Sequence, residues 1–342
     1  MKLKDISLEA GVAVSTVSRV LKDPDSSAAS PETKEKIFQI ALKGGYITEI
    51  PRLDPIDQFP PSSLPAKVLY CMLAVDPKER EDNSYFSRLM ESIREAAHHY
   101  NYMVEYYFPS AESNGAVSLP LDANKTVRGI IVIGRSLPNF VNELKSRFDN
   151  ILYIGLTALD VPCDQIICPG FDAAKSVVEL LHDSGHTRIG FIGSSDDDRI
   201  AGYLKAMEER DLPIDRERMV VTRGMSYLCG HDGMAYLLDH TDPEDPLTAV
   251  FCGNDNTAIG ALQACKERNI QVPEDINLIG MDGSEMGKYM TPSISTVNVP
   301  LEEMGRFAVR VLRDRIHGGH SKPIHIHFPF DILERQSGPT LR

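Results

Sequence analysis

The sequence predicts an all-α helix-turn-helix head followed by an α/β body of two lobes, each built on a parallel sheet. Apolar residues recur every three or four positions over residues 3–21, which is the period of an amphipathic helix. A proline-rich stretch separates this head from the rest of the chain. Beyond it, short apolar runs alternate with helical stretches, a pattern typical of parallel sheets that helices cover on both faces.

The first segment of the head, LKDISLEAGVAVSTVSRVL, predicts two helices rather than one. Its apolar positions are Ile6, Ala10, Val14, Val17 and Leu21. Gly11 interrupts them, and a single helix would not need a glycine there. Two helices joined by a short turn can place the second helix in a DNA major groove. Any two small amphipathic helices share this periodicity, so a purely structural helix pair stays open at this point.

In the DNA-binding interpretation, Val14, Ser15 and Thr16 lie at the start of the helix that reads the DNA. Arg19 follows one turn later and is long enough to reach a guanine edge or a phosphate.

A third helix completes the predicted head. Ser30 is a good N-cap before Pro31 at the first helical position. Gly44 and Gly45 end the helix, and Tyr46 is expected to pack back on it. Its predicted buried face consists of Ile37, Ile40 and Ala41.

The linker that follows contains five prolines, Pro51, Pro55, Pro60, Pro61 and Pro65, which rule out a long helix there. We therefore expect a head over residues 1–47, a linker over 48–66 and a body over 67–335.

Composition limits the class of protein. With 342 residues, 42% of them hydrophobic, the chain can bury two or three domain cores. The net charge of −13 argues against DNA affinity over the whole surface, and because the charges of residues 1–50 cancel, the acidity lies beyond the head. No segment is long and apolar enough to span a bilayer, and no secretory signal is evident. The six cysteines lack a C-x-x-C pair, which predicts reduced thiols in a cytoplasmic protein.

The body is expected to contain two sets of alternating strands and helices. The first set has strands over 68–75, 103–107, 129–134 and 151–154, with helices over 86–100 and 139–148. The second set has strands over 188–193, 219–222, 249–252 and 276–281, with helices over 172–184, 199–210, 230–239 and 254–268.

Enzyme and metal motifs are missing from the sequence. It contains no G-x-x-x-x-G-K-[ST], G-x-S-x-G or H-E-x-x-H, so we expect no catalytic activity and no cofactor. The three adjacent carboxylates of residues 196–198 fit a solvated loop better than a metal site. His317, His320, His325 and His327 lie along a strand-like stretch without a nearby acidic or cysteine partner, so we also expect no metal there.

Several sequence motifs also resemble those of a known protein family. LKDIxxEAGVxxxTVSRVL, followed by the Ser-Pro-Glu-Thr helix start at residues 30–33, strongly resembles the opening of the lactose/galactose repressor family of bacterial transcription regulators. GHTRIGFIGSSDDDRIAGYLKAM, FCGNDNTAIGAL, VPEDINLIGMDG and PSISTVNVPLEEMGRFAV resemble the ligand-binding body of that family. The resemblance implies a periplasmic-binding-protein-like body, with one lobe over about 67–167 and 299–322 and the other over about 168–298 and 323–335.

The resemblance also implies which residues contact DNA: Lys4, Val14, Ser15, Thr16, Ser18, Arg19, Ser30 and, as a wedge in the minor groove, Leu53. Two departures from the family pattern weaken this comparison. Asp54, Pro55 and Asp57 around Leu53 are poor neighbours for phosphates, so Leu53 is equally well a linker residue. Ala13 stands where relatives usually place a serine that caps the second helix, a change that costs about 1 kcal/mol.

Three polar residues follow three strands of the second lobe. Arg199, Asn254 and Asp282 match the residues that bind sugar hydroxyls in relatives, and forked polar groups of this kind both donate and accept hydrogen bonds. Taken singly, Asn254 could instead cap a helix, and Asp282 with Gly283 could form a turn.

Other effector contacts are implied by the resemblance alone. They are Tyr85 and Phe86 from the first lobe, and Met225 with Tyr227 where some relatives stack a tryptophan. Cys168 replaces a usual acidic residue before the crossing between the lobes. The Tyr85-to-Tyr107 region is similar to the branch that contains the repressor of the evolved β-galactosidase, which implies a galactoside effector.

The sequence therefore predicts a dimeric transcription regulator, most simply a repressor, that binds operator DNA through its heads and a small sugar-like effector between its lobes. The alternative from another class is a cytoplasmic sugar-binding sensor that has lost specific operator binding. Control by a protein co-effector is a further option within the regulator class.

Overall fold

The computed structural model describes residues 2–22, 29–46, 67–74, 84–108, 126–134, 138–195 and 198–339. The chain divides into two compact units, Met1–Leu64 and Pro65–Arg342. Across the described residues, every helix falls short of the length or the hydrophobicity that crossing a bilayer requires.

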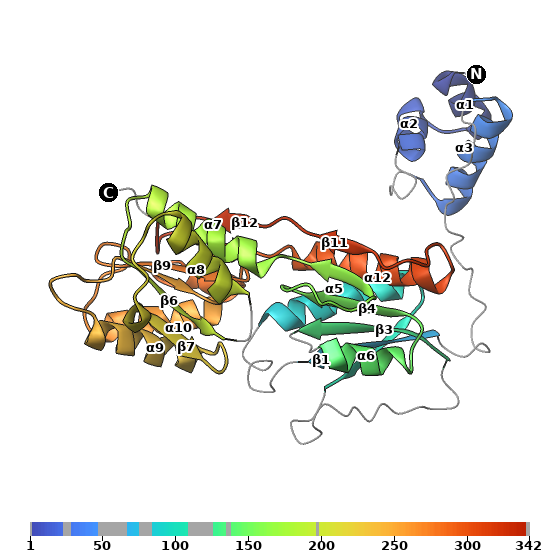
Figure 1. The fold of residues 1–342 in the computed structure, drawn as a ribbon. Coiled ribbons are helices and arrows are strands. Elements are labelled where there is room, and N and C mark those ends of the chain that lie inside the picture. Colours follow the sequence, from blue (N-terminus) through green and yellow to red (C-terminus); the bar gives the residue numbers. More distant parts are fainter. Residues whose placement is uncertain are drawn as a thin grey trace. The chain divides into compact units, whose positions relative to one another are not determined.

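The head consists of α1 (Leu3–Ala10), α2 (Val14–Lys22) and α3 (Pro31–Lys43), as predicted (Figure 1). Gly11 ends α1 with a φ of 73°, a left-handed conformation that suits glycine. Ser30 caps α3, because its hydroxyl accepts a hydrogen bond from the Thr33 N–H at 3.3 Å. The core of the head contains Ile6, Ala10, Val17, Val20, Ile37, Phe38, Ile40 and Ala41.

One position of the predicted apolar face of the head is corrected. Val14 is 38% exposed, whereas Leu21 is partly buried and packs against the core of the head. Val20, three residues after Val17, fills the core position instead. The face of α2 is therefore rotated from the predicted one, which leaves Val14 on the surface. Tyr46 returns to α3 through a hydrogen bond from its N–H to the Ala41 carbonyl, while the residue stays 42% exposed.

The body contains two sheets, each with six strands within the described residues. The first sheet has the order β11-β5-β4-β3-β1-β2, formed by β1 (Lys67–Ala74), β2 (Met103–Tyr107), β3 (Thr126–Gly134), β4 (Ile151–Gly155), β5 (Asp164–Ile167) and β11 (His325–His327). The second has the order β12-β10-β9-β8-β6-β7, formed by β6 (Ile189–Ser194), β7 (Met219–Thr222), β8 (Ala249–Cys252), β9 (Asn277–Met281), β10 (Ser295–Asn298) and β12 (Asp331–Leu333). Among the described strands, only β10 and β12 pair antiparallel.

Helices cover both faces of each sheet (Figure 1). In the first lobe, α5 (Ser84–His99) and α12 (Leu301–Ile316) pack together on one face, and α6 (Pro138–Lys145) lies on the other. In the second lobe α7 pairs with α8 and α9 pairs with α10. Their bounds, with that of the short α11, are α7 (Gly170–Asp183), α8 (Arg199–Glu209), α9 (Tyr227–His240), α10 (Asp255–Glu267) and α11 (Glu285–Tyr289).

The chain crosses between the lobes after β5, after β10 and after β11. The first crossing follows Ile167, the end of β5, and the second follows Asn298, the end of β10. The third lies later than the predicted boundary at about 323, because β11 (His325–His327) still pairs with β5 of the first sheet. A single cluster of buried apolar side chains extends through both lobes, from Leu69 in β1 to Val297 in β10.

Candidate functional site

The outer surface of the head carries most of the predicted DNA contacts. Lys4, Val14, Ser15 and Arg19 are exposed, whereas Thr16 and Ser18 are partly buried. This pattern follows from the helical period, because Val17 and Val20 face the core of the head. Ser30 is exposed but already serves as the cap of α3. Leu53 lies outside the described residues, so its predicted contact with DNA stays a prediction.

Arg199 contacts the ends of two strands of the second lobe, β8 and β9. It is the first residue of α8 and is buried, with 3% exposure. Its Nη1 donates a hydrogen bond to the carbonyl of Gly253, directly after β8, and lies 3.9 Å from the sulfur of Met281, the last residue of β9. The guanidinium therefore lies at the carboxyl edge of the sheet, where the sequence predicts it.

Asn254 has the capping role that the sequence allowed. Its side-chain oxygen accepts a hydrogen bond from the N–H of Thr257 at 2.8 Å, which caps α10. Its side-chain nitrogen donates to the Met225 carbonyl at 2.9 Å. These bonds use one of the two amide hydrogens and one lone pair, so the side chain has the capacity to bind a hydroxyl as well.

Asp282 follows β9 and is buried. Its φ of 118° and the φ of 67° at Gly283 form the turn that the sequence allowed. Its N–H donates to the Val297 carbonyl at 2.9 Å. A non-glycine residue at positive φ is uncommon, so surrounding contacts must hold this turn.

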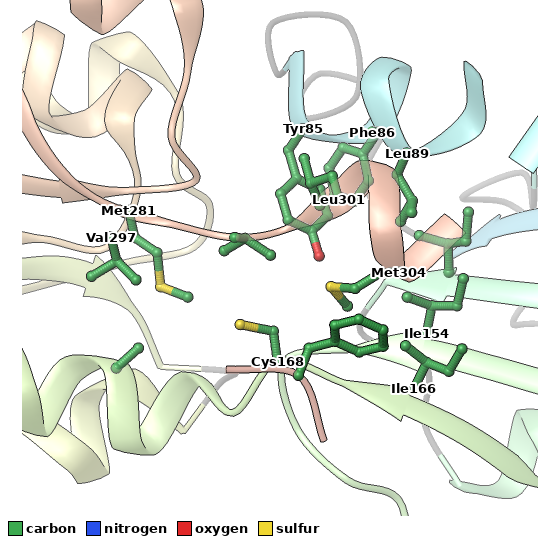
Figure 2. Close-up of a cluster of buried hydrophobic side chains, with 14 of the residues drawn as sticks. Tyr85, Phe86, Leu89, Ile154, Ile166, Cys168, Met281, Val297, Leu301 and Met304 are labelled. Carbon is green, nitrogen blue, oxygen red and sulfur yellow. The ribbon is translucent and has the colours of Figure 1, made fainter. Parts of the chain in front are cut away.

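The first lobe contributes Tyr85 and Phe86 from the first turn of α5. Both are buried, and their rings meet edge to face at 5.1 Å between centroids. Burial and then the charge of Asp282 raise the pKa of Tyr85, so the phenol of the first lobe lies within electrostatic reach of the carboxylate of the second. Figure 2 shows the Tyr85 hydroxyl pointing from α5 toward Cys168 and Met304.

Cys168 and Tyr153 belong to the same neighbourhood. Both contribute to the raised pKa of Tyr85. Burial, followed by the charge of Asp282, raises the pKa of the Cys168 thiol to about 12, so it stays protonated at neutral pH. Tyr153, in β4, donates its hydroxyl to the Gly134 carbonyl at 2.7 Å. Sequence reasoning did not single out Tyr153, although its position near the carboxyl end of a central strand was a usable signal.

Met225 and Tyr227 differ in their burial. Met225 is buried, and its sulfur lies close to Gly253, the residue that accepts the Arg199 hydrogen bond. Tyr227 begins α9 and is 39% exposed, so it stands apart from the buried group. The seven predicted effector residues thus comprise six buried side chains and one on the surface.

The histidine expectation needs one correction. His320 does have acidic partners, since its Nε2 lies 3.0 Å from Asp164 and its Nδ1 lies 2.6 Å from Asp314. Asp164 is distant in sequence and was not foreseen. Within the described ranges, no group of three His, Cys, Asp or Glu side chains is placed to hold a metal ion. The described cysteines are free, and all but Cys229 are buried.

Comparisons with known proteins agree with this architecture. Residues 2–49 match the family model described as "Bacterial regulatory proteins, lacI family", and residues 178–338 match the "Periplasmic binding protein-like domain". The "HTH-type transcriptional repressor MelR" of Bacillus subtilis (strain 168) is 27% identical over 345 residues, covering 98% of this chain and 97% of that protein.

Two solved structures share the fold. The "transcriptional regulator CelR-cellobiose complex" has a TM-score of 0.68 at 23% identity and covers 99% of this chain and 100% of its own. A LacI family transcriptional regulator from Enterococcus faecium with bound ribose has a TM-score of 0.67 at 22% identity, covering 80% of this chain and 100% of its own.

A helix-turn-helix head joined to a periplasmic-binding-protein-like body defines a DNA-binding transcription regulator with an effector domain. Residues 2–49 form a helix-turn-helix domain of the lacI family type, and the chain is similar over nearly its whole length to transcriptional repressors such as MelR.

Proposed function

We propose that this regulator represses sugar-utilisation genes and that a small sugar bound between the lobes controls its affinity for operator DNA. The observation that carries the proposal is the meeting of Arg199, Asn254 and Asp282 at neighbouring strand ends of one lobe, within electrostatic reach of Tyr85 from the other. Neighbouring hydroxyls of a sugar both donate and accept hydrogen bonds, and these side chains supply both roles.

The buried neighbours of the polar group support a ligand with an apolar face. Met225 and Met281 are buried next to it, and Phe86 is buried against the ring of Tyr85. Methionine sulfur is polarisable and adapts to irregular shapes, so it can lie against the C–H face of a sugar ring. The titles of the two similar structures name cellobiose and ribose as their ligands. A galactoside is our proposal for this chain.

We further propose a homodimer in the cytoplasm, where the operator lies. Two heads related by a twofold axis match a palindromic operator with two half-sites. Effector and operator binding would then be coupled reciprocally, because each ligand shifts the same equilibrium between lobe arrangements.

The test is fluorescence anisotropy with the DNA upstream of the protein's own gene, at two salt concentrations, with and without a panel of galactosides, glucosides and ribose. We expect specific binding that weakens with salt and that one sugar of the panel changes. Binding that no sugar changes would reject the sugar effector and favour a protein co-effector. No specific binding at low salt would reject the repressor and favour the sugar-binding sensor.

A further inference from the structure

The loop that carries Asp282 is anchored by the second lobe through three consecutive backbone N–H groups. Asp282 donates to the Val297 carbonyl at 2.9 Å, Gly283 to the Thr296 hydroxyl at 3.2 Å, and Ser284 to the carboxylate of Asp255 at 2.5 Å. Asp255 is itself buried. These bonds hold the loop against its own lobe but leave its carbonyl groups to other partners.

One carbonyl of this loop is held from the opposite lobe. Nη1 of Arg88 donates to the Gly283 carbonyl at 3.0 Å. Arg88 belongs to α5 and follows Tyr85 by three residues, so the two side chains lie on the same face of that helix. Gly283, the neighbour of Asp282, is therefore hydrogen-bonded to α5, the helix that contributes Tyr85 and Phe86 to the candidate site.

The guanidinium of Arg88 is oriented by Glu302. Nε and Nη2 of Arg88 lie 3.1 and 2.9 Å from one carboxylate oxygen of Glu302, in the first turn of α12. The backbone carbonyl of Glu302 accepts a hydrogen bond from Ser92, also in α5, at 2.7 Å. The side chains of Arg88 and Glu302 are 27% and 52% exposed, so the ion pair between them adds little stability by itself. Its effect is geometric, because it aims Nη1 at Gly283.

We propose that Arg88, in the first lobe, is a positioning residue that holds the Asp282 loop of the second lobe in place. Asp282 then faces the effector only while α5 is in contact with this loop. The inference rests on the proposed function for its choice of ligand, but the hydrogen bond to Gly283 can be tested without a ligand.

The test is amide hydrogen exchange of the full-length protein, followed at residues 282–286. Opening of the loop requires the Arg88–Gly283 bond to break, so Arg88→Ala is expected to speed exchange there about two- to tenfold, the range that one hydrogen bond contributes. Arg94→Ala is the matched control. Arg94 lies in the same helix, and in the described part of the chain its guanidinium forms its ion pair with Glu91, three residues earlier in that helix.

Two outcomes would overturn the proposal. The first is equal exchange in Arg88→Ala and Arg94→Ala. The second is acceleration of the same size in β8, which would indicate general destabilisation.

Calorimetric titration with cellobiose, galactose and ribose then tests the positioning role. For any of these sugars that binds the unaltered protein, Arg88→Ala is expected to weaken binding about tenfold and Arg94→Ala to leave it unchanged. Undiminished affinity in Arg88→Ala would reject the positioning role. If none of the three sugars binds the unaltered protein, the result counts against the proposed effector class, while the exchange experiment still decides the inference about Arg88.

Discussion

Arg315 of α12 and Asp164 of β5 form a bidentate ion pair, with Nε and Nη2 lying 2.5 and 2.6 Å from the two carboxylate oxygens. The Asp164 side chain is fully buried, and that of Arg315 is 15% exposed. Asp164 also accepts the N–H of Ile324 at 2.9 Å, just before β11. One buried carboxylate therefore ties together the helix, the strand and the returning chain of the first lobe.

The first prediction concerns this pair. Arg315→Leu leaves a buried carboxylate without its main partner and is expected to lower the free energy of unfolding by about 3 kcal/mol. Chemical denaturation followed by circular dichroism measures it. Arg268→Ala, which breaks the exposed pair with Asp239, serves as the control and should cost under about 1 kcal/mol. Equal losses in the two variants would contradict the structural role of the buried pair.

The second prediction concerns pH. Partial burial disfavours the charged form of His320, but hydrogen bonds to Asp314 and Asp164 raise its pKa above the usual 6.5. A raised pKa in the folded state adds stability that is complete below pH 6.5 and is lost as the pH rises through the folded-state value. The stability difference between the unaltered protein and His320→Gln should therefore shrink from pH 6 to pH 9. Chemical denaturation of both proteins at each pH measures this difference, and a difference that stays constant would contradict the prediction.

The third prediction concerns the contact between α9 and α10. A Cβ at Gly260 would lie 2.0 Å from the Tyr227 carbonyl oxygen, which no side-chain motion can relieve. Gly260→Ala should destabilise the body by about 3 kcal/mol through overpacking. At Gly224, nothing lies within 4 Å of the added Cβ, so Gly224→Ala is the matched control and should change little. Thermal unfolding of both variants decides between these outcomes.

The fourth prediction separates capping from DNA contact at Ser30. Because its hydroxyl caps α3, Ser30→Ala should destabilise that helix by about 1 kcal/mol, visible as faster amide exchange over residues 33–37. Ala13→Ser is the complementary variant and should slow exchange at the start of α2. If Ser30→Ala weakens DNA binding without faster exchange, Ser30 contacts DNA directly and the cap is unimportant.

The fifth prediction concerns Arg19. Its exposed position on α2 predicts that Arg19→Ala weakens operator binding by about 1–3 kcal/mol if it reads a base, and reduces the salt dependence by about one charge if it contacts a phosphate. Lys43→Ala is the control, because it removes the same charge at a position in the last turn of α3 instead of α2. Equal losses in both variants would indicate that only the net charge of the head matters.

Local patterns predicted most of the architecture. The three helices of the head and the long apolar strands have a periodicity that does not depend on distant residues. The short strands β5 and β10 were missed because Asp164 and Gln165 in one, and Ser295 and Thr296 in the other, interrupt an apolar run. The side chains of these polar residues are satisfied by distant partners, such as Arg315 for Asp164 and the Gly338 carbonyl for Ser295, which no local window contains.

The candidate site likewise contains residues that local patterns could predict and residues that they could not. Arg199, Asn254 and Asp282 could be predicted because each follows a recognisable strand, and strand ends meet at one edge of a parallel sheet. Arg88 and Asp255 gave no signal, since their importance comes from contacts with the Gly283 carbonyl and the Ser284 N–H across the fold. The exposure of Tyr227 likewise depends on how α9 packs against α10, which spacing alone does not determine.

The late positions of β11 and β12 have a consequence for biosynthesis. Each supplies an edge strand to a different sheet among the described strands, and both follow α12 in the chain. Neither lobe can complete its sheet until the chain has been synthesised as far as β11 or β12 and has left the ribosome. A stop codon shortly after α12 would therefore leave two unfinished sheets with unpaired edges, exposed to aggregation at the same time.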